Sequence, residues 1–153
     1  MNRWDTIGQD IVKPLPQRHS GAGSATPLFL DYVAASALDP QKIAEVVGGA
    51  AQACRKAGCA LLGGETAEMP GVYQPGELDL VGTMVGVVEQ ARVINGRSIQ
   101  AGDIILGLPS SGLHTNGYTL ARTVLANLDW HSIHPPLWGK RLARRCWRFT
   151  ALT

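Results

Sequence analysis

Residues 38–59, "LDPQKIAEVVGGAAQACRKAGC", limit the possible folds most, because they read as an amphipathic helix that needs an apolar surface opposite it. Asp39 is a natural N-cap, and Pro40 suits the first helical position. Gly58 stands where a left-handed C-terminal cap is expected. The adjacent Gly48 and Gly49 cost about 1 kcal/mol each and predict close approach of a neighbour. The predicted buried face consists of Ile43, Val46, Val47, Ala50 and Cys54.

Strand-like segments follow this helix and alternate with a second helical pattern. We expect strands at "CALL" (59–62), at the valine-rich "LDLVGTMVGVVEQ" (78–90) and at "DIILGLP" (103–109). A hairpin turn is predicted at Asn95–Gly96. "YTLARTVLANL" (118–128) predicts an amphipathic helix. Helices alternating with strands predict an α/β or α+β fold of packed layers.

The composition is that of a globular domain rather than a membrane or secreted protein. The 153 residues are 45% hydrophobic and 17% charged, and no apolar run reaches the roughly 18 residues of a membrane helix. The first ten residues contain no apolar core of a secretory signal. Three cysteines without CxxC spacing favour a reducing compartment. We therefore expect a cytoplasmic protein with no membrane partner.

Residues 63–71, "GGETAEMPG", are the first candidate site, predicted to be a loop at the end of a buried strand. Gly63 and Gly64 would let a ligand approach the backbone without a Cβ in the way. The Glu65 carboxylate beside exposed amides could hold Mg²⁺ against phosphate, since magnesium prefers oxygen ligands. On the residues alone, a surface turn with solvated glutamates is the favoured interpretation.

Residues 110–117, "SSGLHTNG", are the second candidate site. Hydroxyls, amides and an imidazole gather directly before a predicted helix, where unpaired N–H groups and the helix dipole attract anions. The alternative is an ordinary capped helix start. The residues alone do not decide between the two.

Three stretches in this order resemble one enzyme family: "PLFLDYVA", "GGETAEMPGVY" and "GDIILGLPSSGLHTNGYTLAR", with "DTIGQDIV" just upstream. The family is phosphoribosylformylglycinamidine cyclo-ligase, also called aminoimidazole ribonucleotide synthetase. The resemblance covers residues 5–12 and about 27–134. Selenophosphate synthetase and thiamine-monophosphate kinase, ATP-dependent enzymes of the same fold, do not share the whole "GGETAEMPG" string and stand as the alternative kinase-type interpretation.

The resemblance implies an activity and a set of site residues. Members of the family use ATP and Mg²⁺ to phosphorylate the amide oxygen of formylglycinamidine ribonucleotide, after which the imidazole ring closes in de novo purine biosynthesis. The intact enzymes are homodimers. Glu65 would hold the metal, while Asp31, Glu68, Met69 and Pro70 would order the loop or meet the substrate. The implied ATP- and phosphate-binding residues are Gly63, Gly64, Glu65, Thr66, Ser110, Ser111, Gly112, His114 and Asn116.

Two stretches depart from the family pattern, 13–26 and 139–153. Residues 17–27 can be written in codons that, translated in a shifted reading frame, give NDILVQGAQP. Residues 140–153 can likewise be written in codons that give EASGETLLEVHRSY. Both translations resemble the family sequence. We interpret both stretches as products of a shifted reading frame, and we expect neither of them to pack stably. The domain prediction is 1–103 for a partial N-terminal, ATP-binding and dimer-forming domain, 104–138 for the start of the C-terminal domain, and 139–153 for an aberrant tail.

The charge distribution and the missing motifs bear on three hypotheses: an inactive fragment of the cyclo-ligase, a nucleotide-binding or dimerising remnant, and a nucleic-acid-binding protein. Residues 27–138 hold ten acids and six bases, whereas the tail from 139 holds five bases and no acid. A basic tail can bind nucleic acid, but frameshifted text explains it without such a partner, so no nucleic acid is expected. The family's upstream "GTDGVGTK" and downstream "TGGG" motifs are absent from the chain. This favours an inactive fragment of the cyclo-ligase, with a nucleotide-binding or dimerising remnant as the alternative.

Overall fold

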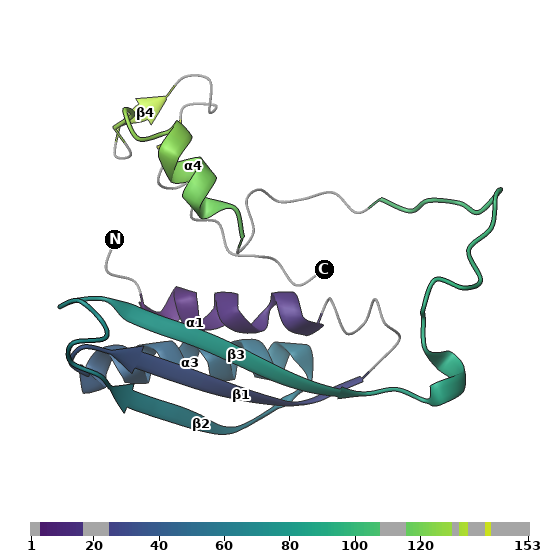
Figure 1. The fold of residues 1–153 in the computed structure, drawn as a ribbon, viewed down its shortest axis with the longest axis horizontal. Helices are drawn as coiled ribbons and strands as arrows, with labels where there is room; N and C mark the ends of the chain where they lie inside the picture. Colours follow the sequence, from purple (N-terminus) through teal and green to yellow (C-terminus); the bar gives the residue numbers. More distant parts are fainter. Residues whose placement is uncertain (1–3, 17–24, 108–115, 130–131, 135–139, 142–153) are drawn as a thin grey trace. The chain divides into compact units, whose positions relative to one another are not determined.

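The computed structural model describes residues 4–16, 25–107, 116–129, 132–134 and 140–141. The chain divides into two compact units, one comprising residues 1–103 and one beginning at Ile104. In the described part, no helix is long and apolar enough to cross a membrane. A three-stranded sheet with two long helices against it confirms the predicted α/β class (Figure 1).

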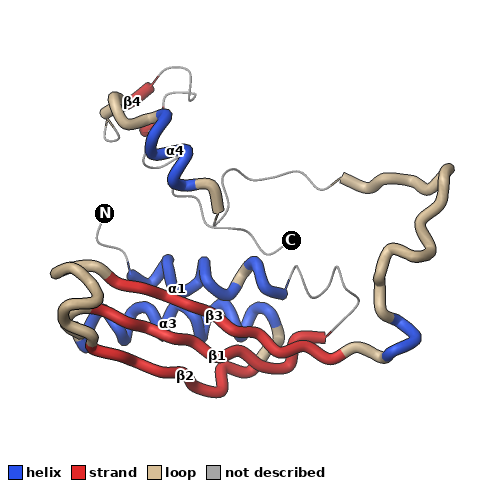
Figure 2. The backbone as a smooth tube through the Cα atoms, viewed as in Figure 1, coloured by secondary structure: helices blue, strands red, loops and turns tan. Residues whose placement is uncertain are grey.

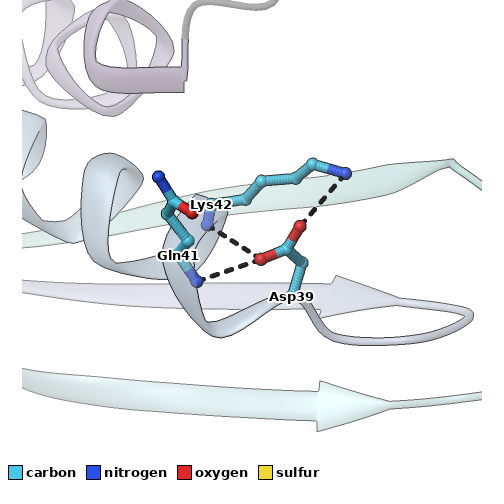
Figure 3. Close-up of polar contacts among 3 residues, drawn as sticks. All are labelled: Asp39, Gln41 and Lys42. Atoms are coloured by element: carbon cyan, nitrogen blue, oxygen red, sulfur yellow. Dashed lines mark hydrogen bonds and ion pairs between the residues drawn. The ribbon is translucent and has the colours of Figure 1, made fainter.

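Helix α3, Pro40–Ala57, confirms the predicted helix with both of its caps. The Asp39 carboxylate accepts hydrogen bonds from the backbone N–H groups of Gln41 and Lys42, at 3.0 and 3.4 Å, and pairs with the Lys42 ammonium at 3.4 Å (Figure 3). Gly58 ends the helix in the left-handed conformation, with φ of 70°. The helix therefore begins and ends where its own sequence dictates.

The sheet has the order β2-β1-β3, with β1 (Ala25–Ala35) in the centre, β2 (Ala60–Glu68) and β3 (Leu78–Val87) (Figure 2). Strands β1 and β2 are parallel and joined through α3, whereas β3 runs antiparallel to β1. The prediction of a strand at 78–90 is confirmed as far as Val87. The central strand β1, which sequence reasoning left without an element, is signalled only by its apolar run "PLFLDYVAA".

Helix α1, Trp4–Val12, lies beside α3 on the same face of the sheet (Figures 1 and 2). A Cβ on Gly49 would overlap the carbonyl of Asp5, and one on Gly8 would overlap the carbonyl of Val46. At Gly48 nothing lies within 4 Å of such a Cβ. The predicted close packing at the glycine pair is thus confirmed for Gly49, and the neighbour is α1.

The core lies between the sheet and this helical layer. Phe29 of β1 is fully buried there, and its ring lies 2.7 Å from where a Cβ of Gly82 would stand. The Cys54 and Cys59 thiols are also buried. Burial raises the pKa of Cys54 to about 12, so this thiol stays protonated at neutral pH and packs as an apolar group. The core cluster contains Val12, Phe29, Ala50, Ala53, Cys54 and Cys59.

The stretch 13–26, expected to lack packing, is ordered at both ends. Residues 14–16 are helical, Lys13 is only 5% exposed, and Leu15 packs against the core cluster. Burial lowers the pKa of Lys13, against the opposing effect of Asp10. Ala25 begins strand β1. The expectation was wrong for these ends because they continue from regular elements, while residues 17–24 lie outside the described part.

The segment after β3 corrects a second expectation. The predicted turn is present, since Arg97 N–H donates to Asn95 Oδ1 at 3.0 Å, but no hairpin follows. Residues 103–107 form no strand, and Ile104, Ile105 and Leu106 are 86–95% exposed. A strand needs a partner for its backbone N–H and C=O groups. Within the described ranges, 103–107 pairs with none.

The second unit contains α4, Tyr118–Val124, which confirms the predicted helix in a shorter form. Strand β4, Ile133–His134, pairs antiparallel with β5, Lys140–Arg141. Lys140 and Arg141, within the stretch 139–153, therefore form a short ladder, contrary to the expected lack of structure. Residues 142–153 lie outside the described part, and the frameshift interpretation itself stays a prediction.

Candidate functional site

The segment "GGETAE", predicted to be a loop after a short strand, is itself the main part of strand β2. Gly63 to Glu68 pair in parallel with Leu30 to Ala35, after a register shift between Phe29 and Leu30. Glycine and glutamate have weak strand propensity, but backbone hydrogen bonds to the buried central strand outweigh it. The loop begins only at Met69, where the backbone N–H donates to the Ala35 carbonyl at 2.8 Å.

Side chains alternate between the two faces of a sheet, and this alternation separates the candidate residues. Glu65 pairs with Tyr32, and Gly64 pairs with Asp31. Asp31 also pairs with Gly82 on β3. A Cβ on Gly82 would point at the Phe29 ring and at the carbonyl of Ile11 in α1, so this face of the sheet is the one that the helices cover. Glu65 therefore lies on the open face, and Asp31 and Gly64 lie on the helix-covered face.

Glu65 is exposed on strand β2, which is an edge strand of the sheet. Its Oε1 accepts a hydrogen bond from the backbone N–H of Thr66 at 3.0 Å, and Oε2 makes none with any described residue. Tyr32 stands next to Glu65 on the central strand, with Val81 beyond it on β3. The outer edge of β2 presents backbone groups that no described strand pairs. One carboxylate oxygen and this edge can thus meet a ligand.

The structure explains the two glycines before Glu65 in different ways. Gly63 has φ of 147°, which strains other residues, and no atom of the described residues lies within 4 Å of a Cβ there. Its surroundings are open, as the ligand hypothesis requires. A Cβ on Gly64 would instead overlap the backbone carbonyl and the carboxylate of Asp31. Packing against Asp31 explains this glycine without any ligand.

Glu68 closes strand β2 and holds the connection into helix α3. Its Oε2 accepts a hydrogen bond from the backbone N–H of Leu38 at 2.7 Å, directly before the Asp39 cap. A carboxylate here orders the loop at the carboxyl end of β1. It also uses an acceptor that would otherwise be available to a metal ion.

The turn after Glu68 folds toward the open face of the sheet. The Tyr32 hydroxyl donates to the Met69 sulfur at 3.6 Å, and Pro70 forms a bridge with Tyr73. The Tyr73 hydroxyl donates to Asp79 at 3.1 Å, and this hydrogen bond raises the pKa of Tyr73. Sequence reasoning missed the role of Tyr32, which is the register partner of Glu65 and donates a hydrogen bond to Met69 in this turn. Its only signal was the strand register.

The second candidate site falls mainly on residues that the structure does not describe. Ser110, Ser111, Gly112 and His114 lie outside the described residues. Asn116 is exposed, and Gly117 after it takes the N-cap position of α4 with φ of 88°. This loop belongs to the second unit.

The predicted magnesium site rests on Glu65 alone. Within the described ranges, no group of three or more His, Cys, Asp or Glu side chains converges as metal ligands. Magnesium commonly uses only one or two carboxylates together with substrate phosphates and water. The Oε2 of the exposed Glu65, to which no described residue donates, is compatible with that mode.

Comparison with known proteins identifies the family. Residues 3–88 match the model described as AIR synthase related protein, N-terminal domain. The chain belongs to this family. Over 137 residues it is 50% identical to phosphoribosylformylglycinamidine cyclo-ligase of Desulfitobacterium hafniense (strain DSM 10664 / DCB-2), covering 90% of this chain and 40% of that protein. Over 122 residues it is 55% identical to the protein of that name in Alkaliphilus oremlandii (strain OhILAs), covering 80% and 36%.

The match covers only part of each relative: the chain spans about two fifths of the length of the family members it matches. A solved structure of thiamine monophosphate kinase from Aquifex aeolicus aligns with a TM-score of 0.46 and 14% identity. That alignment covers 55% of this chain and 27% of the kinase chain.

Proposed function

We propose that this chain is part of an ATP-dependent cyclo-ligase that converts formylglycinamidine ribonucleotide to aminoimidazole ribonucleotide, and that it is inactive by itself. The observation that carries the proposal is 50% identity over 90% of the chain to a protein named for this activity, of which the chain spans 40%. We place the enzyme in the cytoplasm, in keeping with its purine-biosynthetic role and with the buried free thiols of Cys54 and Cys59.

The β2 edge is the part of the nucleotide site that this chain retains. Gly63 leaves the backbone open to approach, and Glu65 offers beside it one carboxylate oxygen that no described residue engages. In our proposal Glu65 holds Mg²⁺ together with ATP phosphates; the bound metal would neutralise charge on the transferred phosphoryl group. Asp31 and Glu68 have structural roles instead. Asp31 packs against Gly64, and Glu68 accepts a hydrogen bond from the backbone N–H of Leu38.

Turnover by this chain alone is not expected. Phosphoryl transfer depends on several groups held in place at once, and such groups act as a unit, so losing some of them removes most of the activity. By resemblance, an aspartate and a lysine upstream and a glycine-rich loop downstream complete the site. The chain is expected to bind Mg-nucleotide weakly without consuming it.

Two measurements on the purified chain test this function. Titration calorimetry with Mg-ATP should show weak binding that Glu65→Ala abolishes and that Glu89→Ala, an exposed carboxylate outside the site, leaves unchanged. Phosphate release from ATP should not increase with formylglycinamidine ribonucleotide. Substrate-dependent release that Glu65→Ala removes would refute the inactive-fragment proposal. Binding that does not depend on Glu65 would move the metal role to another residue.

The open face of the sheet supports a second copy of the chain as partner. Val81, Val85 and Val87 of β3 are 43–62% exposed, and Leu30 of β1 is 37% exposed. A sheet face exposed to water normally carries polar residues. An apolar face of this kind marks an association surface. We propose that two copies pair through this face, as the resemblance implies for intact family members.

A further inference from the structure

The Asn95–Gly96 turn is a motif that the proposed function leaves unused. Both residues are exposed, and Gly96 has φ of 78°. Arg97 N–H donates to the Asn95 side-chain carbonyl at 3.0 Å, and Ile99 N–H donates to the Gly96 carbonyl at 3.2 Å. These contacts hold the Asn95 side chain against the backbone that follows it. The turn therefore fixes a side-chain amide beside a main-chain amide in contact with water.

The same geometry favours attack on the Asn95 side chain. The ring closed by the Asn95–Arg97 hydrogen bond includes both the Asn95 amide carbon and the Gly96 nitrogen, the two atoms that would bond. Glycine has no Cβ to hinder approach from its own nitrogen. The Arg97 N–H lies on the oxygen where negative charge would develop in a tetrahedral intermediate, and a donor in that position stabilises it.

We propose that Asn95 is a site of spontaneous deamidation in the folded chain. The Gly96 nitrogen loses its proton and bonds to Cγ of Asn95, and Nδ2 leaves as ammonia with a proton from solvent, which gives a cyclic imide. Water then cleaves the imide. Opening at Cγ gives aspartate, and opening at the main-chain carbonyl gives isoaspartate. The net reaction consumes one water, releases one ammonia and adds one negative charge at position 95.

Peptide mapping by mass spectrometry tests this site after incubation of the whole chain in ¹⁸O-labelled water. We expect aspartate and isoaspartate at position 95, each carrying one labelled oxygen, and faster conversion at higher pH because the attacking nitrogen must lose a proton. Asn127, which is exposed but precedes Leu128, is the internal control and should stay intact. The map also separates Asn95 from Asn116, which precedes another glycine.

Two variants and a peptide complete the test. Asn95→Gln should abolish product at this position, and Gly96→Ala should slow its formation severalfold. Because alanine is strained at the φ of Gly96, a synthetic peptide of residues 92–99 provides a reference that needs no folding. Conversion of the folded chain at the rate of the peptide or faster supports the proposal. An intact Asn95 under conditions that convert the peptide would overturn it.

Discussion

Adding one methyl group at Gly48 or at Gly49 should change stability in opposite directions, although the two residues are neighbours in helix α3. At Gly48 no described atom lies within 4 Å of an added Cβ, so Gly48→Ala should stabilise the helix by about 0.5–1 kcal/mol. At Gly49 the Cβ would overlap the Asp5 carbonyl and lie 3.3 Å from the Gln9 nitrogen. Backbone cannot move aside as a side-chain tip can, so α1 must shift.

The expected magnitude follows from two opposing effects at Gly49. Overpacking costs roughly 1–3 kcal/mol, while the gain in helix propensity is about 1 kcal/mol. Because the overlap at Gly49 is with backbone atoms, we take the upper part of that range, about 2–3 kcal/mol. Gly49→Ala should therefore destabilise the fold by about 1–2 kcal/mol, which separates the two variants by about 1.5–3 kcal/mol. With a urea dependence of about 1–2 kcal/mol per molar, typical of small domains, their unfolding midpoints should differ by about 0.75–3 M.

Urea unfolding followed by far-ultraviolet circular dichroism measures both midpoints under identical conditions. Gly8→Ala is the matched variant on α1, because its Cβ would overlap the Val46 carbonyl at the same crossing. It should destabilise like Gly49→Ala, and the double variant should be non-additive, since the two residues share one contact region. If Gly49→Ala stabilised the chain as much as Gly48→Ala, α1 would not pack on α3 as described.

Three further predictions concern the core, the helix cap and the open face. Phe29→Ala, at a fully buried site, should lower the free energy of unfolding by about 3–5 kcal/mol, and Leu30→Ala on the opposite face should cost less; thermal unfolding would contradict this if the two losses were equal. Hydrogen bonds from the backbone N–H groups of Lys42 and Gln41 lower the pKa of Asp39 in the folded chain. The ionised Asp39 therefore stabilises the fold at pH values above the ordinary aspartate pKa, and this stabilisation is lost as the pH falls through the lower folded pKa. The stability difference between the chain and Asp39→Ala should therefore shrink in acid, and a constant difference would exclude the cap. Val85→Lys should weaken self-association in sedimentation velocity, whereas Ile99→Lys, at an exposed residue in the segment after β3, should not; a dilute monomer without either change would remove the proposed dimer.

Local chemistry was enough to predict α3 to the residue at both ends. Asp39 accepts from amides only two and three residues away, and Gly58 ends the helix through its own backbone conformation. Strand β3 was likewise legible from its valine-rich sequence, and the "GGETAEMPG" string was enough to suggest the family. These features depend on contacts between residues close in sequence or on the identity of the residues themselves.

Only the tertiary structure decided how the candidate site is arranged. Gly63 to Glu68 become a strand because β1, about thirty residues earlier in the chain, supplies their hydrogen-bond partners. The apolar run at 103–107 forms no strand because no described segment supplies such partners. The register with β1 also places Glu65 on the open face and Asp31 on the helix-covered face. Side-chain direction in a sheet depends on pairing between distant segments, which the order of residues alone does not specify.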